Sequence, residues 1–435
     1  MKTKQKMSMI VMGLVLGLMH NAHATSGAYV TGRYRNLFAE QGYTEQEIDA
    51  KVRSAYRQLF HGHPETQSLY YPMGHNEQGP LAQIRDINSR DVRSEGMSYG
   101  MMIAVQMNLR SQFDKLWKFA KTHMQYHGDS TGSLSAWKHY FRWQLTDIDA
   151  SGRDEWKWTR GETTAPAPDG EEYFAMSLYL ADRRWGSSGT VDYKKEADAI
   201  SNALLNNRAA ESRCPVIDRD ENLIVFVPYG ESAGFTDPSY HLPAFYECFA
   251  SWGPEENAAR WSLVAEKSRQ HLVDAAYPGT GLHPDYAGFD GTPVTDTGGT
   301  RGTGLSGTAH DTFRHDAWRV PMNMAMDWAW TRKDSRMKAG AEAYHAFFGR
   351  HFTGTDVSNS LFSLDGGHPK GGGSTALTAS LAAAGMVSDH VDVPSWIRAL
   401  WNIEQQEGPY RYFQECIYLL GLLNVSGLYR ISWNG

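Results

Sequence analysis

Apolar residues recur at three- and four-residue spacing along most of the chain, and this pattern predicts a succession of helices. The twelve predicted helices span residues 44–60, 94–110, 111–126, 170–185, 192–208, 239–252, 256–275, 316–332, 334–352, 374–387, 392–404 and 413–425. Thr44 with Glu47 and Asp169 with Glu172 have the spacing of a capping box, and Asp237 precedes a proline at the start of another helix.

Long loops rich in Gly, Pro, Asp and Trp mostly fall at every second junction between predicted helices. They span residues 61–92, 127–168, 209–237, 278–314 and 353–373. This alternation predicts six helical hairpins whose longer connections gather on one face. We therefore expect an all-α fold, an (α/α)6 barrel with its cleft at the centre of that face, and an open helical array is the alternative.

The first residues have the features of a secretory signal. Lys2, Lys4 and Lys6 precede an apolar stretch at 9–19, and Ala22-His23-Ala24 fits a cleavage site. We expect residues 1–24 to be removed and the protein to be exported, either to a periplasm or out of the cell. No linker interrupts residues 25–435, which predicts a single catalytic domain, and no later stretch is long and apolar enough to span a membrane.

Composition narrows the classes of partner. Loss of the three leader lysines takes the formal charge from -7 to about -10, which disfavours nucleic acid as a partner. The 14 Trp residues could stack on sugar rings, although most large aromatics in proteins are core residues. Cys214, Cys248 and Cys416 permit at most one disulfide and lie in no nucleophile motif.

Metal or cofactor binding has little support in the sequence, and we expect neither. Residues 147–152 begin like a calcium loop, but Trp158 stands where that loop needs a glutamate, so a turn is predicted instead.

Three acidic residues, Glu95, Asp169 and Asp316, open predicted helices inside motifs crowded with Gly, Pro and aromatics. Asp169 and Asp316 could simply cap their helices. Glu95 is harder to explain in that way, because Glu is a poor cap and Gly96 follows it. Glycoside hydrolysis needs one protonated carboxyl and one carboxylate, about 6.5–9.5 Å apart if the reaction inverts the anomeric carbon and about 5 Å apart if it retains it.

The motifs at 94–100, 166–174, 237–246 and 316–320 together resemble those of glycoside hydrolase family 8, in the same order. The resemblance covers nearly the whole chain after residue 24. It implies an (α/α)6 barrel and an inverting hydrolase of β-1,4-linked glycans. It also implies that Glu95 is the general acid, that Asp316 is the general base, and that Asp169 holds the distorted sugar and helps to place the water.

The same resemblance implies further residues in the substrate site. The expected substrate-binding residues are Trp137, Tyr240, His315, Arg319, His368, Tyr410 and Tyr412. Phe413 stands where xylan-active members of the family often carry a second tyrosine.

Within the family, the chain is most similar to the xylan-active branch. Residues 34–38, 42–43 and 64–66 resemble the exo-oligoxylanases that release xylose from the reducing end. Those enzymes wall off the cleft with a Leu-His-Pro loop, and this chain has Gly367-His368-Pro369 there. We expect a monomer that trims xylo-oligosaccharides or xylan. An endo-β-1,4-xylanase with an open cleft is the first alternative, followed by another β-1,4-glycanase of the family. A non-catalytic oligosaccharide-binding protein is the alternative from a different class.

Overall fold

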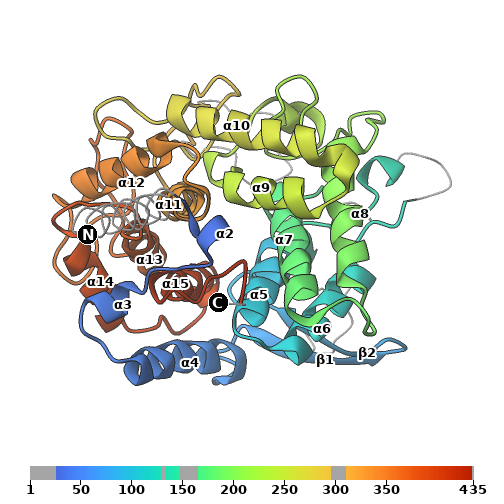
Figure 1. Ribbon diagram of the computed structural model, residues 1–435, viewed down its shortest axis with the longest axis horizontal. Coiled ribbons are helices and arrows are strands. Elements are labelled where there is room, and N and C mark those ends of the chain that lie inside the picture. The colour runs from blue at the N-terminus through green and yellow to red at the C-terminus, as the bar shows by residue number, and fades with distance from the viewer. Residues whose placement is uncertain (1–25, 129–133, 147–164, 295–309, 434–435) are drawn as a thin grey trace, which may run out of the picture.

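The computed structural model describes residues 26–128, 134–146, 165–294 and 310–433 (Figure 1). Each of the twelve predicted helices is present in it. Six of them form an inner ring: α5 (Ser94–Gln106), α7 (Pro168–Trp185), α9 (Pro243–Trp252), α11 (Val320–Thr331), α13 (Thr375–Ala384) and α15 (Arg411–Val425). Six form an outer layer: α4 (Glu45–His61), α6 (Arg110–Phe119), α8 (Tyr193–Asn206), α10 (Ala258–Asp274), α12 (Ser335–Phe348) and α14 (Val393–Asn402).

The inner helices contact one another in sequence, and α15 returns to contact α5, so the ring is closed (Figure 1). Each inner helix also packs on one outer helix, with α4 covering α15. The inner helices are buried on most sides; in α13, for example, every residue after Thr375 is buried. The predicted (α/α)6 barrel is therefore confirmed, and the open helical array is wrong.

The inner helices all begin at one mouth of the barrel, because each inner helix is followed by an outer helix that runs back. The long connections lie before the inner helices, as the loop lengths predicted. Three of them carry short helical turns: η2 (Leu134–Trp137) before α7, η3 (Gly230–Gly234) and η4 (Pro238–Tyr240) before α9, and η7 (His315–Arg319) before α11. Two others, η1 (Ala120–Met124) and η5 (Glu255–Asn257), extend or precede outer helices.

Some elements are absent from the sequence prediction. Strand β1 (Tyr70–Asn76) pairs antiparallel with β2 (Gly79–Ile84), and β3 (Asp91–Arg93) pairs with β4 (Gln144–Thr146). Two one-turn helices, α2 (Ala28–Thr31) and α3 (Leu37–Glu40), precede α4. The two helices have four residues each, which is too short for a helical period to be read from the sequence.

The three predicted caps have different outcomes. Thr44 and Glu47 form the capping box at the start of α4, and the side chain of Asp237 accepts from the N–H of Ser239 at 2.7 Å. The capping box of Asp169 with Glu172 is wrong, because Pro168 takes the first position of α7 and Asp169 the second. The Asp169 carboxylate is used elsewhere, as described below.

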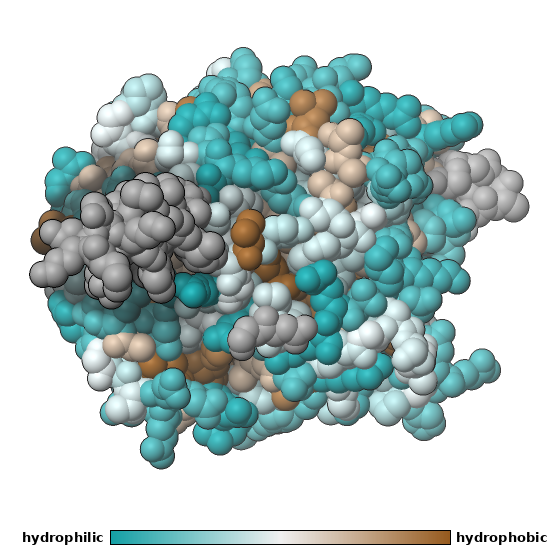
Figure 2. Space-filling view, viewed as in Figure 1, coloured by the Kyte–Doolittle hydropathy of each residue, from teal (hydrophilic) through white to brown (hydrophobic). Residues whose placement is uncertain are grey.

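Several sequence expectations fall on other parts of the chain. The leader at 1–24 and the calcium-like turn at 147–158 lie outside the described residues. Cys214, Cys248 and Cys416 are all free thiols. Among the described helices, none combines the length and the apolar character needed to cross a membrane, and the face shown in Figure 2 is largely hydrophilic.

Candidate active site

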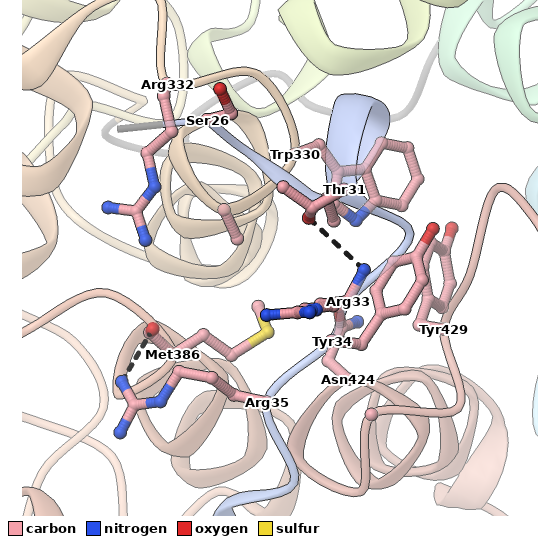
Figure 3. Close-up of a pocket in the computed structure, with 13 residues that line it drawn as sticks. Ser26, Thr31, Arg33, Tyr34, Arg35, Trp330, Arg332, Met386, Asn424 and Tyr429 are labelled. Carbon is pink, nitrogen blue, oxygen red and sulfur yellow. Dashed lines mark hydrogen bonds between the residues drawn. The ribbon is translucent and has the colours of Figure 1, made fainter. Parts of the chain in front are cut away.

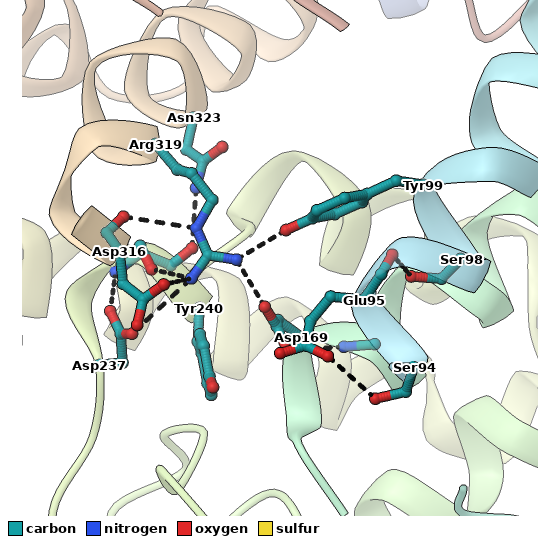
Figure 4. A network of polar contacts seen from close by, with 12 residues as sticks. Ser94, Glu95, Ser98, Tyr99, Asp169, Asp237, Tyr240, Asp316, Arg319 and Asn323 are labelled. Atoms are coloured by element: carbon teal, nitrogen blue, oxygen red, sulfur yellow. Dashed lines mark hydrogen bonds and ion pairs between the residues drawn. The ribbon is translucent and has the colours of Figure 1, made fainter. Parts of the chain in front are cut away.

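A buried arginine, Arg319, lies at the mouth of the inner ring with carboxylates on both sides of it (Figure 4). One terminal nitrogen donates to Asp169 at 2.5 Å and the other forms an ion pair with Asp316 at 3.1 Å. A third carboxylate, that of Asp237, lies 3.8 Å from the guanidinium. The residues at 169, 237 and 316, which are far apart in sequence, therefore share one cation.

Other groups hold Arg319 in this position. It donates to the hydroxyl of Tyr99 at 2.6 Å and to that of Ser239 at 2.7 Å, and its guanidinium lies 5.6 Å from the ring centre of Tyr240. All of the terminal N–H directions are thus engaged, which fixes the plane of the guanidinium.

Glu95 lies at the second position of α5, on the far side of Asp169 from Asp316 (Figure 4). The indole N–H of Trp143 donates to one of its carboxyl oxygens at 3.0 Å, and Ser94 Oγ lies 3.4 Å from the other. Burial, followed by the charge of Asp169, raises the pKa of Glu95 to about 8. A helix N-terminus favours the ionised form. The burial effect is larger here, so the carboxyl is protonated at neutral pH.

Asp169 responds to two opposing influences. Burial raises its pKa to about 6, although the ion pair and hydrogen bond to Arg319 act in the opposite direction. Its second carboxyl oxygen accepts from the N–H of Gly170 at 2.9 Å. Asp169 is therefore placed between the acid and the cation, with its charge held close to Glu95.

Asp316 is partly accessible, with its side chain 34% exposed. It lies at the second position of η7, as Glu95 and Asp169 do in their helices. Its backbone N–H donates to Asp285 at 3.3 Å. Asp316 is thus an acid with a cation beside it and access to solvent.

The remaining predicted substrate residues lie in different surroundings. Tyr240 and Tyr412 are buried near the acids: Asp169 raises the pKa of Tyr240 and Glu95 that of Tyr412, in each case after burial. The ring of Tyr412 lies directly against the backbone of Gly96, so any side chain at 96 would collide with it. This contact, and not a ligand, explains the glycine.

Tyr410, His315 and His368 lie at the surface. Tyr410, just before α15, is 69% exposed. His315 packs edge-on against Trp318, and Trp318 in turn contacts Phe413.

Trp137 has a different environment from the one the resemblance implied. It is only 2% exposed, its indole donates to the carbonyl of Pro228 at 3.2 Å, and the guanidinium of Arg213 covers its ring at 4.8 Å. These contacts give it a packing role in this structure.

Sequence reasoning missed Trp143, Tyr99, Asp285 and His310, which the structure brings to the acids or their supports. Trp143 follows a buried Phe at 141 and directly precedes the short strand β4, in a loop with too many aromatics to single one out. The Asp237 motif was noted for its cap, but its proximity to Arg319 could not be read from spacing.

A separate cavity of about 260 Å³ lies at the opposite end of α11 (Figure 3). Arg33, Arg35 and Arg332 line it, next to the ends of α11, α13 and α15. Arg35 donates to the carbonyl of Met386 at 2.8 Å, beyond the end of α13. The arginines are explained by the nearby helix C-termini, which favour positive charge. The 12 residues of α11 separate this cavity from Arg319 by about 18 Å. The acids are therefore the candidate active site.

The chemistry of the site is that of a hydrolase working with carboxyl groups. Within the described residues, no group of three or more His, Cys, Asp or Glu side chains is arranged to hold a metal ion. One protonated carboxyl and one carboxylate at the mouth of an (α/α)6 barrel are the groups that a glycoside hydrolase uses.

Comparison with known proteins identifies the family. Residues 77–425 match glycosyl hydrolases family 8, and the chain belongs to this family. It is 38% identical to the reducing-end xylose-releasing exo-oligoxylanase Rex8A of Paenibacillus barcinonensis, over 93% of this chain and 98% of that one. It is 35% identical to a reducing end xylose-releasing exo-oligoxylanase of Halalkalibacterium halodurans, over 94% and 96% of the two chains.

A solved structure agrees with the fold. A family 8 xylobiose complex from Teredinibacter turnerae superposes with a TM-score of 0.82 at 39% identity, covering 93% of this chain and 99% of that one.

Proposed function

We propose that the protein is an inverting hydrolase of β-1,4-xylosidic bonds that releases xylose from the reducing end of xylo-oligosaccharides. The observation that carries this proposal is the pairing of a protonated Glu95, whose pKa is raised to about 8, with a partly exposed, Arg319-paired Asp316 in one site. The names of the two relatives described above support the substrate class and the mode of cleavage.

In the proposed reaction, Glu95 donates its proton to the glycosidic oxygen as the bond from that oxygen to the anomeric carbon breaks. Asp316 takes a proton from a water whose oxygen bonds to the anomeric carbon from the opposite face. A β-linkage therefore yields an α-configured product, and the two carboxyls exchange protonation states. Asp169, fixed by Arg319, would hold the distorted sugar next to the acid.

Release of a single xylose requires a barrier beyond the leaving-group position. The candidate barrier is the hairpin at 361–370, whose ends pair through two backbone hydrogen bonds between Leu361 and Lys370. Phe362 of this hairpin also pairs with Phe313, three residues before Asp316, at 2.9 and 3.1 Å. The carbonyl of Ser360 accepts from the indole of Trp318 at 2.8 Å.

These contacts tie the hairpin to both sides of the Asp316 segment. Its returning arm carries the exposed His368, which has a left-handed φ of 48°. The hairpin is thus anchored beside the proposed base, which favours a fixed wall over a loose flap. It carries Gly367 where the exo-acting enzymes have leucine, and this keeps an endo-β-1,4-xylanase with an open cleft as the second candidate function.

The test is the early product pattern from xylohexaose labelled at its reducing end. Labelled xylose with unlabelled xylopentaose is the expected first product pair. Labelled xylobiose and xylotriose would instead establish an open cleft and endo action. Absence of cleavage would redirect the assignment to other β-1,4-glycans, since Endoglucanase A of Acetivibrio thermocellus is 28% identical to this chain over 339 residues. Tight binding of xylo-oligosaccharides without any cleavage would identify a binding protein.

We also propose that residues 1–24 direct export, after which the protein acts as a monomer. The lysines and apolar stretch described above support this. Expression of the full chain should place a species beginning near Thr25 outside the cytoplasm, and deletion of 1–24 should retain the protein inside. Light scattering of the processed chain should give the mass of one copy.

A further inference from the structure

The carboxylate of Asp285 connects the backbone N–H of Asp316 with the imidazole of His310, and neither of these two groups has a part in the proposed reaction. One oxygen accepts the backbone N–H of Asp316 at 3.3 Å, and the other contacts Nδ1 of His310 at 2.5 Å. Both side chains are 3% exposed. The pair, named here the 285–310 dyad, is thus a buried link that ends on the backbone of the proposed base.

The backbone around the dyad is fixed by its own hydrogen bonds. The N–H of Asp285 donates to the carbonyl of Thr312 at 2.9 Å, and that of Tyr286 donates to His310 at 3.0 Å. The ring of His310 also stacks on Tyr286 with centroids 4.2 Å apart and planes within 6°. The dyad is therefore held in place independently of Asp316.

Helix η7, which carries Asp316, has no capping side chain of its own. Arg314 stands at its N-cap position and forms no cap hydrogen bond there. The orphan N–H at the second position is satisfied by Asp285, from a loop 31 residues earlier. Losing this bond would free the first turn of η7 to move, and the Asp316 carboxylate would move with it.

Asp285 interacts electrostatically with the charged groups around it, Asp316 included. Burial, then the charge of Asp316, raises the pKa of Asp285 well above its usual range, while Arg314 and Arg319 act in the opposite direction. Asp285 therefore interacts with the Asp316 segment in two ways, through its hydrogen bond to the backbone N–H and through the charge of the Asp316 carboxylate.

We propose that Asp285 and His310 form a positioning unit that fixes the general base Asp316 by capping η7, with His310 holding the Asp285 carboxylate in place. This rests on the proposed role of Asp316. It concerns the chemical step and not substrate affinity, because the unit acts through the backbone of Asp316.

The test compares two substitutions at one position. Asp285→Asn keeps an oxygen that can accept the N–H of Asp316 and resembles the protonated acid, so kcat should fall no more than about 3-fold. Asp285→Ala removes the acceptor, and kcat should fall about 10- to 100-fold with KM nearly unchanged, as expected for a displaced catalytic group. Asp290→Ala, an exposed residue of the same loop, is the matched control and should behave as wild type.

His310→Asn provides a second measurement that holds even if Asp285→Ala does not fold. His310→Asn should lower kcat without changing KM. The double variant Asp285→Asn/His310→Asn should be no slower than His310→Asn alone, because both residues act on Asp316 through the same hydrogen bond. Additive losses, a change confined to KM, or normal kcat in Asp285→Ala would overturn the proposal. Failure of the base assignment itself would be recognised separately, since Asp316→Asn would then retain normal turnover.

Discussion

The two proposed catalytic carboxyls occupy equivalent places in the barrel and differ in their surroundings. Glu95 and Asp316 each take the second position of a helix that begins at the same mouth. Glu95 is partly buried beside an indole and the charge of Asp169, whereas Asp316 is a third exposed and paired with Arg319. The comparison shows that position sets the direction of each side chain, and environment sets its protonation state.

The arginine explains how so many acids can be placed together. Arg319 takes Asp169 and Asp316 as direct partners and leaves Glu95 with none of its charge-assisted bonds. Arg93 also acts on Glu95 and lowers its pKa, but by less than burial and the charge of Asp169 raise it. Direct pairing of Arg319 with Asp316 and not with Glu95 therefore divides two like groups into one acid and one base, the arrangement that glycoside hydrolysis requires.

The largest effects should come from removing either carboxyl. Glu95→Gln and Asp316→Asn should each lower kcat on xylotriose by about 10²- to 10⁴-fold, the range of general acid–base catalysis, with unchanged helical circular dichroism. Near-normal turnover by either variant would contradict its assigned role.

A substrate with an activated leaving group should separate the two roles. A xylobioside of dinitrophenol needs little protonation at its leaving oxygen, so Glu95→Gln should regain most of its activity on it. Asp316→Asn should stay inactive, because the water still has to be deprotonated. Equal recovery of both variants would mean that the acid and base are wrongly assigned.

A smaller effect is expected from Asp169→Asn, which removes the charge that faces Glu95. Because that charge raises the pKa of Glu95, the alkaline limb of the kcat/KM profile should move to lower pH. Glu172→Gln changes another buried acid of α7, bonded to Tyr246, and should leave the limb in place. An unmoved limb in Asp169→Asn would mean that burial alone sets the Glu95 pKa.

Much of this fold could be predicted from the chain, for a physical reason. Helical periodicity and alternating loop lengths are local, so they define twelve helices and the face on which the long loops gather. The closure of α15 on α5 is a contact between distant segments that no local pattern specifies. It was inferred from the hairpin pattern and from the resemblance.

The candidate site was predicted less evenly. Glu95, Asp169 and Asp316 could be found because each begins a helix in an unusual motif. The Asp169 cap was wrong because a proline occupies the first turn and a distant arginine competes for the carboxylate. Asp285 could not be found, because its role depends on a contact across 31 residues.

Two tryptophans from the same loop region should differ in a way that sequence does not reveal. Trp143→Phe removes the N–H that donates to Glu95, and kcat should fall about 10-fold, as expected for one hydrogen bond to a catalytic group. Trp137→Phe removes the bond to Pro228 and should lower thermal stability while leaving kcat unchanged. The reverse outcome would return Trp137 to the substrate site.

The smallest effect is on stability, and its sign follows from the raised pKa of Glu95. That pKa is about 8 in the folded protein and near 4.5 in the unfolded chain, so between these values the folded form binds the extra proton. The stability that this proton provides is complete below pH 4.5 and is lost as pH rises towards 8, by up to about 1.4 kcal/mol per pH unit. Gln cannot titrate, so Glu95→Gln should gain stability relative to wild type between pH 5 and 7.5, measured by denaturant unfolding. A difference that stays constant with pH would show that the folded pKa of Glu95 is not raised, and the acid in the comparison with Asp316 would then need another explanation.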